Sequence, residues 1–140
     1  MNNLPPHLRL LVVEDDEISQ FLIERLLTDL HITSTIVSNG PDALEILEQE
    51  AFDAILMDIE MPVMSGFEAT SIIRNSENSA IKNIPIIGMS ANPFEIAQEP
   101  YLEIGMNEYI TKPIHELELL EKLEKQIKTK EKKGKIANPE

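Results

Sequence analysis

The chain has 140 residues, of which 42% are hydrophobic, and its 25 acidic and 12 basic side chains give a formal charge of −13. This length suits one domain with one core. The absence of cysteine excludes disulfide scaffolds and thiolate chemistry, and the surplus of acid disfavours direct binding to nucleic acid or anionic membranes. The apolar runs are too short to span a bilayer and residues 1–7 lack the pattern of a signal peptide, so we expect a cytoplasmic protein.

Short apolar runs alternate along the chain with stretches in which apolar residues recur every three or four positions. The runs are typical of strands buried on both faces, and the recurring positions are typical of amphipathic helices. Pro41 stands at a helix start, whereas Pro93 and Pro100 predict that the helix after the fourth run is short or distorted. In chain order the expected elements are strand 8–13, helix 18–30, strand 33–37, helix 41–47, strand 52–57, a turn at 61–66, helix 67–73, a polar stretch at 75–83, strand 84–89, a helix after Pro93, strand 109–111 and helix 117–127.

This alternation predicts an α/β fold in which helices cover both faces of a parallel sheet. Functional sites in such open sheets lie beyond the carboxyl ends of the strands. The charge pattern adds boundaries, because seven of the 12 basic residues lie in residues 122–140. We therefore expect an N-terminal extension at 1–7, a domain at 8–128 and a basic tail at 129–140 that is frayed or disordered. The tail is interpreted as solvated, with an anionic partner as the alternative.

Carboxylate, hydroxyl and amine side chains directly follow four of the five expected strands. Several carboxylates at one place repel one another unless a cation joins them, and an all-oxygen set favours a hard cation such as Mg²⁺. A lysine and a hydroxyl can hold an anion beside that cation, and one carboxylate can act as nucleophile. The set therefore suits phosphoryl transfer to an aspartate. Its members are Glu14, Asp15, Asp16, Asp58, Ser90 and Lys112.

Four motifs carry a resemblance to the receiver domain of two-component response regulators. They are L-V-V-E-D-D-E at 11–17, M-D-I-E-M-P-V-M-S-G-F-E-A-T at 57–70, I-P-I-I-G-M-S-A-N at 84–92 and G-M-N-E-Y-I-T-K-P-I at 105–114. The order and spacing of these motifs match the family, and their residues are most similar to those of receivers of hybrid sensor histidine kinases. The resemblance implies a flavodoxin-like, doubly wound sheet of five parallel strands in the order 2-1-3-4-5, with five helices on both faces.

The resemblance also implies a metal-dependent phosphoacceptor. Asp58 matches the phosphorylated aspartate and a Mg²⁺ ligand. Asp15 matches a second direct ligand of the ion, the main-chain carbonyl of Glu60 matches the third protein ligand, and Glu14 acts mainly through water. Asp16 falls where related sequences often carry asparagine, so we place it outside this set.

The remaining implied roles concern the response to phosphorylation. Ser90 matches the hydroxyl that turns toward the phosphoryl group, Lys112 the lysine that pairs with it, and Tyr109 the aromatic residue that moves with Ser90. The Lys112–Pro113 bond matches one that the family holds cis. Ser90 stands where threonine is also common, and Glu60 adds a carboxylate that alters the phosphoryl lifetime in either direction.

The leading hypothesis is a signalling module rather than an enzyme. Mg²⁺-dependent phosphorylation of Asp58, from a phosphohistidine on a sensor histidine kinase or a histidine phosphotransfer protein, switches a docking surface or relays phosphate onward. We expect a monomer or a weak phosphorylation-dependent dimer, without nucleic-acid or membrane partners.

Two alternatives belong to other classes. One is a pseudo-receiver that docks without phosphorylation. The other is a Mg²⁺-dependent aspartyl phosphatase, which usually has a second aspartate where Glu60 stands. His7, His31 and His115 lack the spacing of metal ligands, so surface positions are expected for them.

Overall fold

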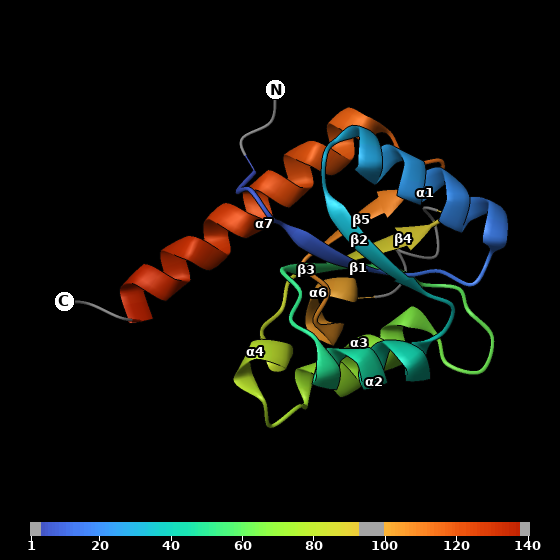
Figure 1. Cartoon of the computed structure of the whole chain (residues 1–140). Helices are drawn as coiled ribbons and strands as arrows, with labels where there is room; N and C mark the ends of the chain where they lie inside the picture. Colours follow the sequence, from blue (N-terminus) through green and yellow to red (C-terminus); the bar gives the residue numbers. More distant parts are fainter. Residues whose placement is uncertain (1–3, 93–99, 138–140) are drawn as a thin grey trace.

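The computed structural model of the chain describes residues 4–92 and 100–137, with side chains described as far as residue 128. Five parallel strands form one sheet in the order β2-β1-β3-β4-β5 (Figure 1). The strands are β1 (Arg9–Val13), β2 (Thr33–Val37), β3 (Ala54–Asp58), β4 (Ile86–Ser90) and β5 (Glu108–Thr111). The expected parallel sheet and its strand order are therefore confirmed, and the fold is flavodoxin-like.

Six helices lie in the described part of the chain, one more than the sequence predicts. They are α1 (Glu17–Asp29), α2 (Gly40–Gln49), α3 (Gly66–Arg74), α4 (Ser79–Lys82), α6 (Tyr101–Ile104) and α7 (Glu116–Ala137). The additional helix α4 falls in the polar stretch 75–83. Its four residues are too few to show a helical period, and the side chain of Asn78 caps it by accepting a hydrogen bond from Ala80 N at 2.9 Å.

Alternate residues of the central strands pack against different helices. Leu10 and Val12 of β1 belong to a core with α1 and α7, whereas Leu11 and Val13 belong to a core with α2 and α3. The direction of the chain across the sheet reverses after β2, and right-handed crossovers then place α1 and α2 on opposite faces. Figure 1 shows this three-layer arrangement. All residues of β3 and β4 are buried, which explains their uninterrupted apolar runs.

Two boundaries expected from the sequence are the start of the helix after Pro93 and the end of the domain at residue 128. The sequence predicts a helix after Pro93, but residues 93–99 lie outside the described part of the chain. The next described helix, α6, begins directly after Pro100. Helix α7 continues to Ala137 and so passes residue 128, the expected end of the domain.

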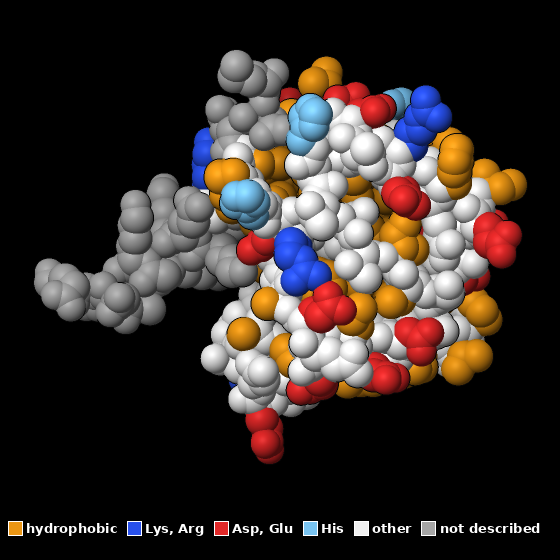
Figure 2. Space-filling view, in the orientation of Figure 1, with side chains coloured by type: hydrophobic (Ala, Val, Ile, Leu, Met, Phe, Trp, Pro, Cys, Tyr) orange, Lys and Arg blue, Asp and Glu red, His pale blue; other side chains and the backbone are white. Residues whose placement is uncertain are grey.

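The surface carries the acidic surplus of the sequence. Figure 2 shows more acidic than basic side chains on the face that it draws. His7, His31 and His115 are exposed, as expected. Within the described residues, no helix has both the length and the apolar character needed to cross a membrane.

Candidate functional site

The parallel register brings the polar ends of β1 and β3 together. Val13, the last residue of β1, lies beside Met57 of β3, so Glu14 and Asp58 continue the same pair of neighbouring strands. At the other side of β3, Ser90 ends β4 and pairs with Thr111, the last residue of β5. Lys112 follows at once, and its main-chain N donates to Ser90 O at 2.8 Å. The sheet thus gathers the predicted side chains at one edge.

Three of the predicted acids form a single cluster. Glu14, Asp15 and Asp58 each offer a carboxylate oxygen, and these oxygens lie within 4.8 Å of one another. Glu14 is completely buried and Asp58 is 3% exposed, whereas Asp15 is open to solvent. An all-oxygen set with one open side fits Mg²⁺, because this ion binds few carboxylates and keeps several waters.

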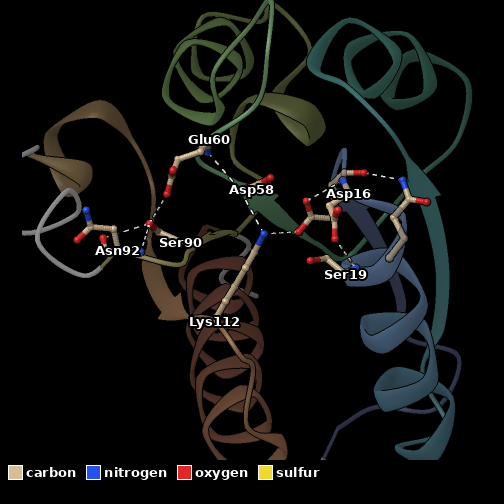
Figure 3. A network of polar contacts seen from close by, with 9 residues as sticks. Asp16, Ser19, Asp58, Glu60, Ser90, Asn92 and Lys112 are labelled. Carbon is tan, nitrogen blue, oxygen red and sulfur yellow. Dashed lines mark hydrogen bonds and ion pairs between the residues drawn. The ribbon is translucent and has the colours of Figure 1, made fainter.

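Lys112 contacts both buried acids of this cluster. Its Nζ forms an ion pair with Glu14 Oε1 and lies 3.5 Å from Asp58 Oδ1. Figure 3 shows the side chain of Lys112 reaching from the end of β5 toward Asp58. Burial lowers the pKa of Lys112, but the hydrogen bond to Glu14 and the charges of both acids outweigh this effect and raise it. Lys112 is therefore a permanent positive charge beside Asp58 at neutral pH.

The carboxyl of Asp58 is held in an unfavourable environment for its charge. Burial and the nearby Glu14 raise its pKa to about 8, against the opposing effect of Lys112. One lysine thus fails to balance two buried carboxylates. Two ionised carboxylates at this site need a further cation, and without one Asp58 keeps a proton, which is compatible with a Mg²⁺ site.

Glu60 and Ser90 contact each other beside Asp58. Glu60 N donates to Asp58 Oδ1 at 3.2 Å, and Ser90 Oγ donates to Glu60 Oε1 at 2.9 Å. Asn92 N donates to Ser90 Oγ at 3.0 Å. The sequence singled out Glu60 and Ser90 separately, whereas their mutual hydrogen bond joins residues 30 positions apart and has no sequence signal.

Asp16 lies at the start of α1 and serves as its N-cap. Its Oδ2 accepts from Ser19 N at 2.9 Å, and this hydrogen bond lowers the pKa of Asp16. Its carboxylate is not part of the acidic cluster found among the described residues. Gln20, which the sequence did not single out, donates to Glu14 O at 2.6 Å and to Ser38 Oγ at 3.2 Å.

Tyr109 lies away from this cluster, on β5. Its ring meets Tyr101 edge-on, with centroids 5.1 Å apart, and Lys122 Nζ lies 5.1 Å from the ring centroid. The described contacts contain none between Tyr109 and Ser90, so the two implied switch residues are not joined in this arrangement. The Lys112–Pro113 peptide bond is cis, the form that the resemblance implies.

Comparisons with known proteins agree with this geometry. The family described as response regulator receiver domain matches residues 10–124. The chain is 40% identical over 124 residues to hybrid signal transduction histidine kinase I of Dictyostelium discoideum, covering 85% of this chain but only 7% of that protein.

Two solved structures extend the comparison. The receiver domain of sensor histidine kinase PA1611 from Pseudomonas aeruginosa has a magnesium ion coordinated in its active site cleft. It matches with 38% identity and a TM-score of 0.78, over 86% of this chain and 98% of that one. A chain from the complex of the Saccharomyces cerevisiae histidine phosphotransfer protein Ypd1 with the receiver domain of Ssk1 matches with 28% identity and a TM-score of 0.74, over 86% and 89%.

Proposed function

Because the chain belongs to the response regulator receiver domain family, we propose that Asp58 accepts a phosphoryl group from a phosphohistidine in a Mg²⁺-dependent reaction. The observation that carries the proposal is the position of Asp58. Its buried carboxylate lies within 4.8 Å of carboxylate oxygens of Glu14 and Asp15 and 3.5 Å from Lys112 Nζ. Receiver domains are signalling modules of two-component and phosphorelay systems, and the reaction would serve to change their state.

The proposed transfer exchanges one bond to phosphorus for another. An oxygen of Asp58 attacks the phosphorus, and the P–N bond to histidine breaks as the O–P bond forms. The ring keeps the bonding electrons and, because its other nitrogen carries a proton, it leaves as neutral imidazole. Asp58 must be ionised to attack, and Lys112 favours that form. A Mg²⁺ ion, held by Asp15, Asp58 and the Glu60 carbonyl with Glu14 acting through water, would supply the remaining positive charge.

The acyl phosphate needs donors for its oxygens. The amine of Lys112 lies beside Asp58. Ser90 is the last residue of β4, which pairs with β3 and β5, so it lies at the same edge of the sheet. We propose that Ser90 turns toward the phosphoryl group and that Tyr109 moves with it. This movement would alter a docking surface around β5, or the phosphoryl group would pass onward. Slow autodephosphorylation would return the site to its starting state.

The partners follow from this chemistry. We propose a sensor histidine kinase or a histidine phosphotransfer protein as donor, in the cytoplasm, acting on a domain that spans residues 8–128. The domain would be a monomer or a weak phosphorylation-dependent dimer. The solved complex of Ypd1 with the Ssk1 receiver supports a histidine phosphotransfer protein as one class of partner.

Mass spectrometry of the intact protein tests the assignment. We expect incubation with a small phosphodonor such as phosphoramidate and Mg²⁺ to add the mass of one phosphoryl group, which a chelator prevents. Asp58→Asn should take up none, because an amide is not a nucleophile of this kind. Asp53→Asn, on an aspartate whose carboxylate binds Arg9 N at 2.8 Å away from the site, is the matched control. Uptake by Asp58→Asn would overturn the assignment.

A further inference from the structure

The buried hydroxyl of Ser90 already has its partners without a phosphoryl group. Ser90 is completely buried, and its Oγ lies 2.9 Å from Glu60 Oε1 and 3.1 Å from Asn92 O, while it accepts from Asn92 N at 3.0 Å. Figure 3 shows Ser90 between the side chain of Glu60 and Asn92. A buried hydroxyl that makes all its hydrogen bonds has a defined orientation, and here the Ser90 hydroxyl is directed toward the carboxylate of Glu60.

The hydroxyl has a single proton to donate. Two acceptors compete for it, and the carboxylate of Glu60 is the stronger because hydrogen bonds to ionised acceptors are about twice as strong as neutral ones. The distance to Glu60 is also the shorter of the two. The hydroxyl of Ser90 therefore donates its hydrogen bond to the carboxylate of Glu60 in this arrangement.

Glu60 links Ser90 to the acceptor aspartate. Its main-chain N donates to Asp58 Oδ1 at 3.2 Å, and its side chain accepts from Ser90. Glu60 itself is exposed, and no ion pair of its carboxylate is found among the described residues. A phosphoryl group on Asp58 would bring a second anion to the same hydroxyl, and one proton cannot serve both.

We propose that Glu60 is a positioning residue whose carboxylate holds the Ser90 hydroxyl away from Asp58 until the phosphoryl group displaces it. The proposal rests on the proposed function and adds a competing acceptor to it. Glu60 thereby sets how strongly phosphorylation must favour the switched state, since Ser90 must give up a charge-assisted hydrogen bond to turn.

A double-mutant cycle with trifluoroberyllate, a phosphoryl analogue, measures this competition in the Mg²⁺-loaded protein. We expect Glu60→Ala to bind the analogue about tenfold more tightly, and Glu60→Gln to lie between, because its amide oxygen is a weaker acceptor. Both variants keep the main-chain carbonyl of residue 60. In a Ser90→Ala background the gain should largely vanish. Glu68→Gln removes an exposed charge that has no described bond to Ser90 and should leave the affinity unchanged.

A second readout needs neither metal nor analogue. In the metal-free protein, the Hα–Hβ couplings of Ser90 should report one rotamer, and Glu60→Ala should change the rotamer populations, because only the two bonds to Asn92 remain, while Glu68→Gln should not. Equal gains with and without the Ser90 hydroxyl would mean charge repulsion alone and would overturn the proposal, as would couplings that Glu60→Ala leaves unchanged. Failure of the proposed function is distinct from either, because the unsubstituted protein would then gain no phosphoryl mass.

Discussion

Two polar networks lie at opposite edges of the same sheet, and they balance their charges differently. At the amino-terminal edge, Arg74 donates to Gly105 O at 2.8 Å, to Lys82 O at 2.7 Å and to Asn107 Oδ1 at 2.9 Å. Asn107 Oδ1 also accepts from Ile86 N at 2.8 Å. We call this set the Arg74 network. It joins the ends of α3, α4 and α6 to β4, and the acceptors of these four hydrogen bonds are all neutral.

The carboxyl-terminal edge holds the opposite arrangement. Glu14 and Asp58 are both buried, yet Lys112 is the one basic side chain that pairs with them among the described contacts. Burial and the neighbouring Glu14 raise the pKa of Asp58 there, and the single charge of Lys112 does not offset them. The comparison teaches that the first network is complete within the chain, whereas the second needs a cation or a proton from outside. Structure and function are thus separated to the two edges.

The largest expected loss of stability from one substitution comes from breaking the Arg74 network. Arg74→Ala removes three hydrogen bonds of a charged side chain and takes the side-chain donor from the partly buried Gly105 O, so we expect the free energy of unfolding to fall by about 3 kcal/mol. Phosphoryl uptake by the fraction that remains folded should be unchanged. Urea unfolding measures the first quantity and intact mass the second.

Arg9→Ala is the matched control for this substitution. Arg9 forms an exposed ion pair with Glu50 at 2.6 Å and lies 5.0 Å from the centroid of the Phe52 ring. Exposed pairs contribute less than about 1 kcal/mol. Equal losses for Arg9→Ala and Arg74→Ala would contradict the structural role assigned to the Arg74 network.

The next effect concerns pH and the charge excess around Asp58. Because its pKa is raised from 3.8 to about 8 on folding, the folded protein keeps a proton that the unfolded chain has already lost between these values. The unfolded state then binds fewer protons, so the free energy of unfolding of the metal-free protein should fall as pH rises through this window. The slope is at most about 1.4 kcal/mol per pH unit. Urea titrations at several pH values in a chelating buffer measure it.

Asp58→Asn removes this titrating group and should remove most of the slope. The variant should also be the more stable protein at pH 8, because it no longer buries a second carboxylate beside Glu14. Added Mg²⁺ should stabilise the unsubstituted protein at high pH and the variant much less. A slope that survives Asp58→Asn would place the titration elsewhere.

The same contrast explains how far the sequence alone could lead. The strands β3 and β4 were predictable because they are buried on both faces, and short uninterrupted apolar runs between helical patterns are typical of such strands. Asp58 and Lys112 were predictable because they stand directly after strands. The Arg74 network was not, since its acceptors lie 8, 31 and 33 residues from Arg74 and follow no period. The bond between Glu60 and Ser90 was hidden for the same reason.

The smallest effects separate the two neighbouring acids that open α1. Asp15 belongs to the acidic cluster, whereas the side chain of Asp16 caps the helix. We expect Asp15→Ala to lower Mg²⁺ affinity by at least about tenfold, since loss of even an outer-shell partner of a metal costs 10–100-fold, with little change in thermal stability.

Asp16→Ala should have the reverse pattern of effects. The substitution removes the helix cap and lowers the thermal midpoint. The affinity for Mg²⁺ should stay within about threefold, because salt screens the attraction between the ion and the exposed carboxylate of Asp16. Calorimetric titration and thermal unfolding of the two variants measure both quantities, and a larger loss of affinity in Asp16→Ala would reverse the two roles. The substitutions are chemically identical and adjacent, so a difference between them can only come from where each carboxylate points.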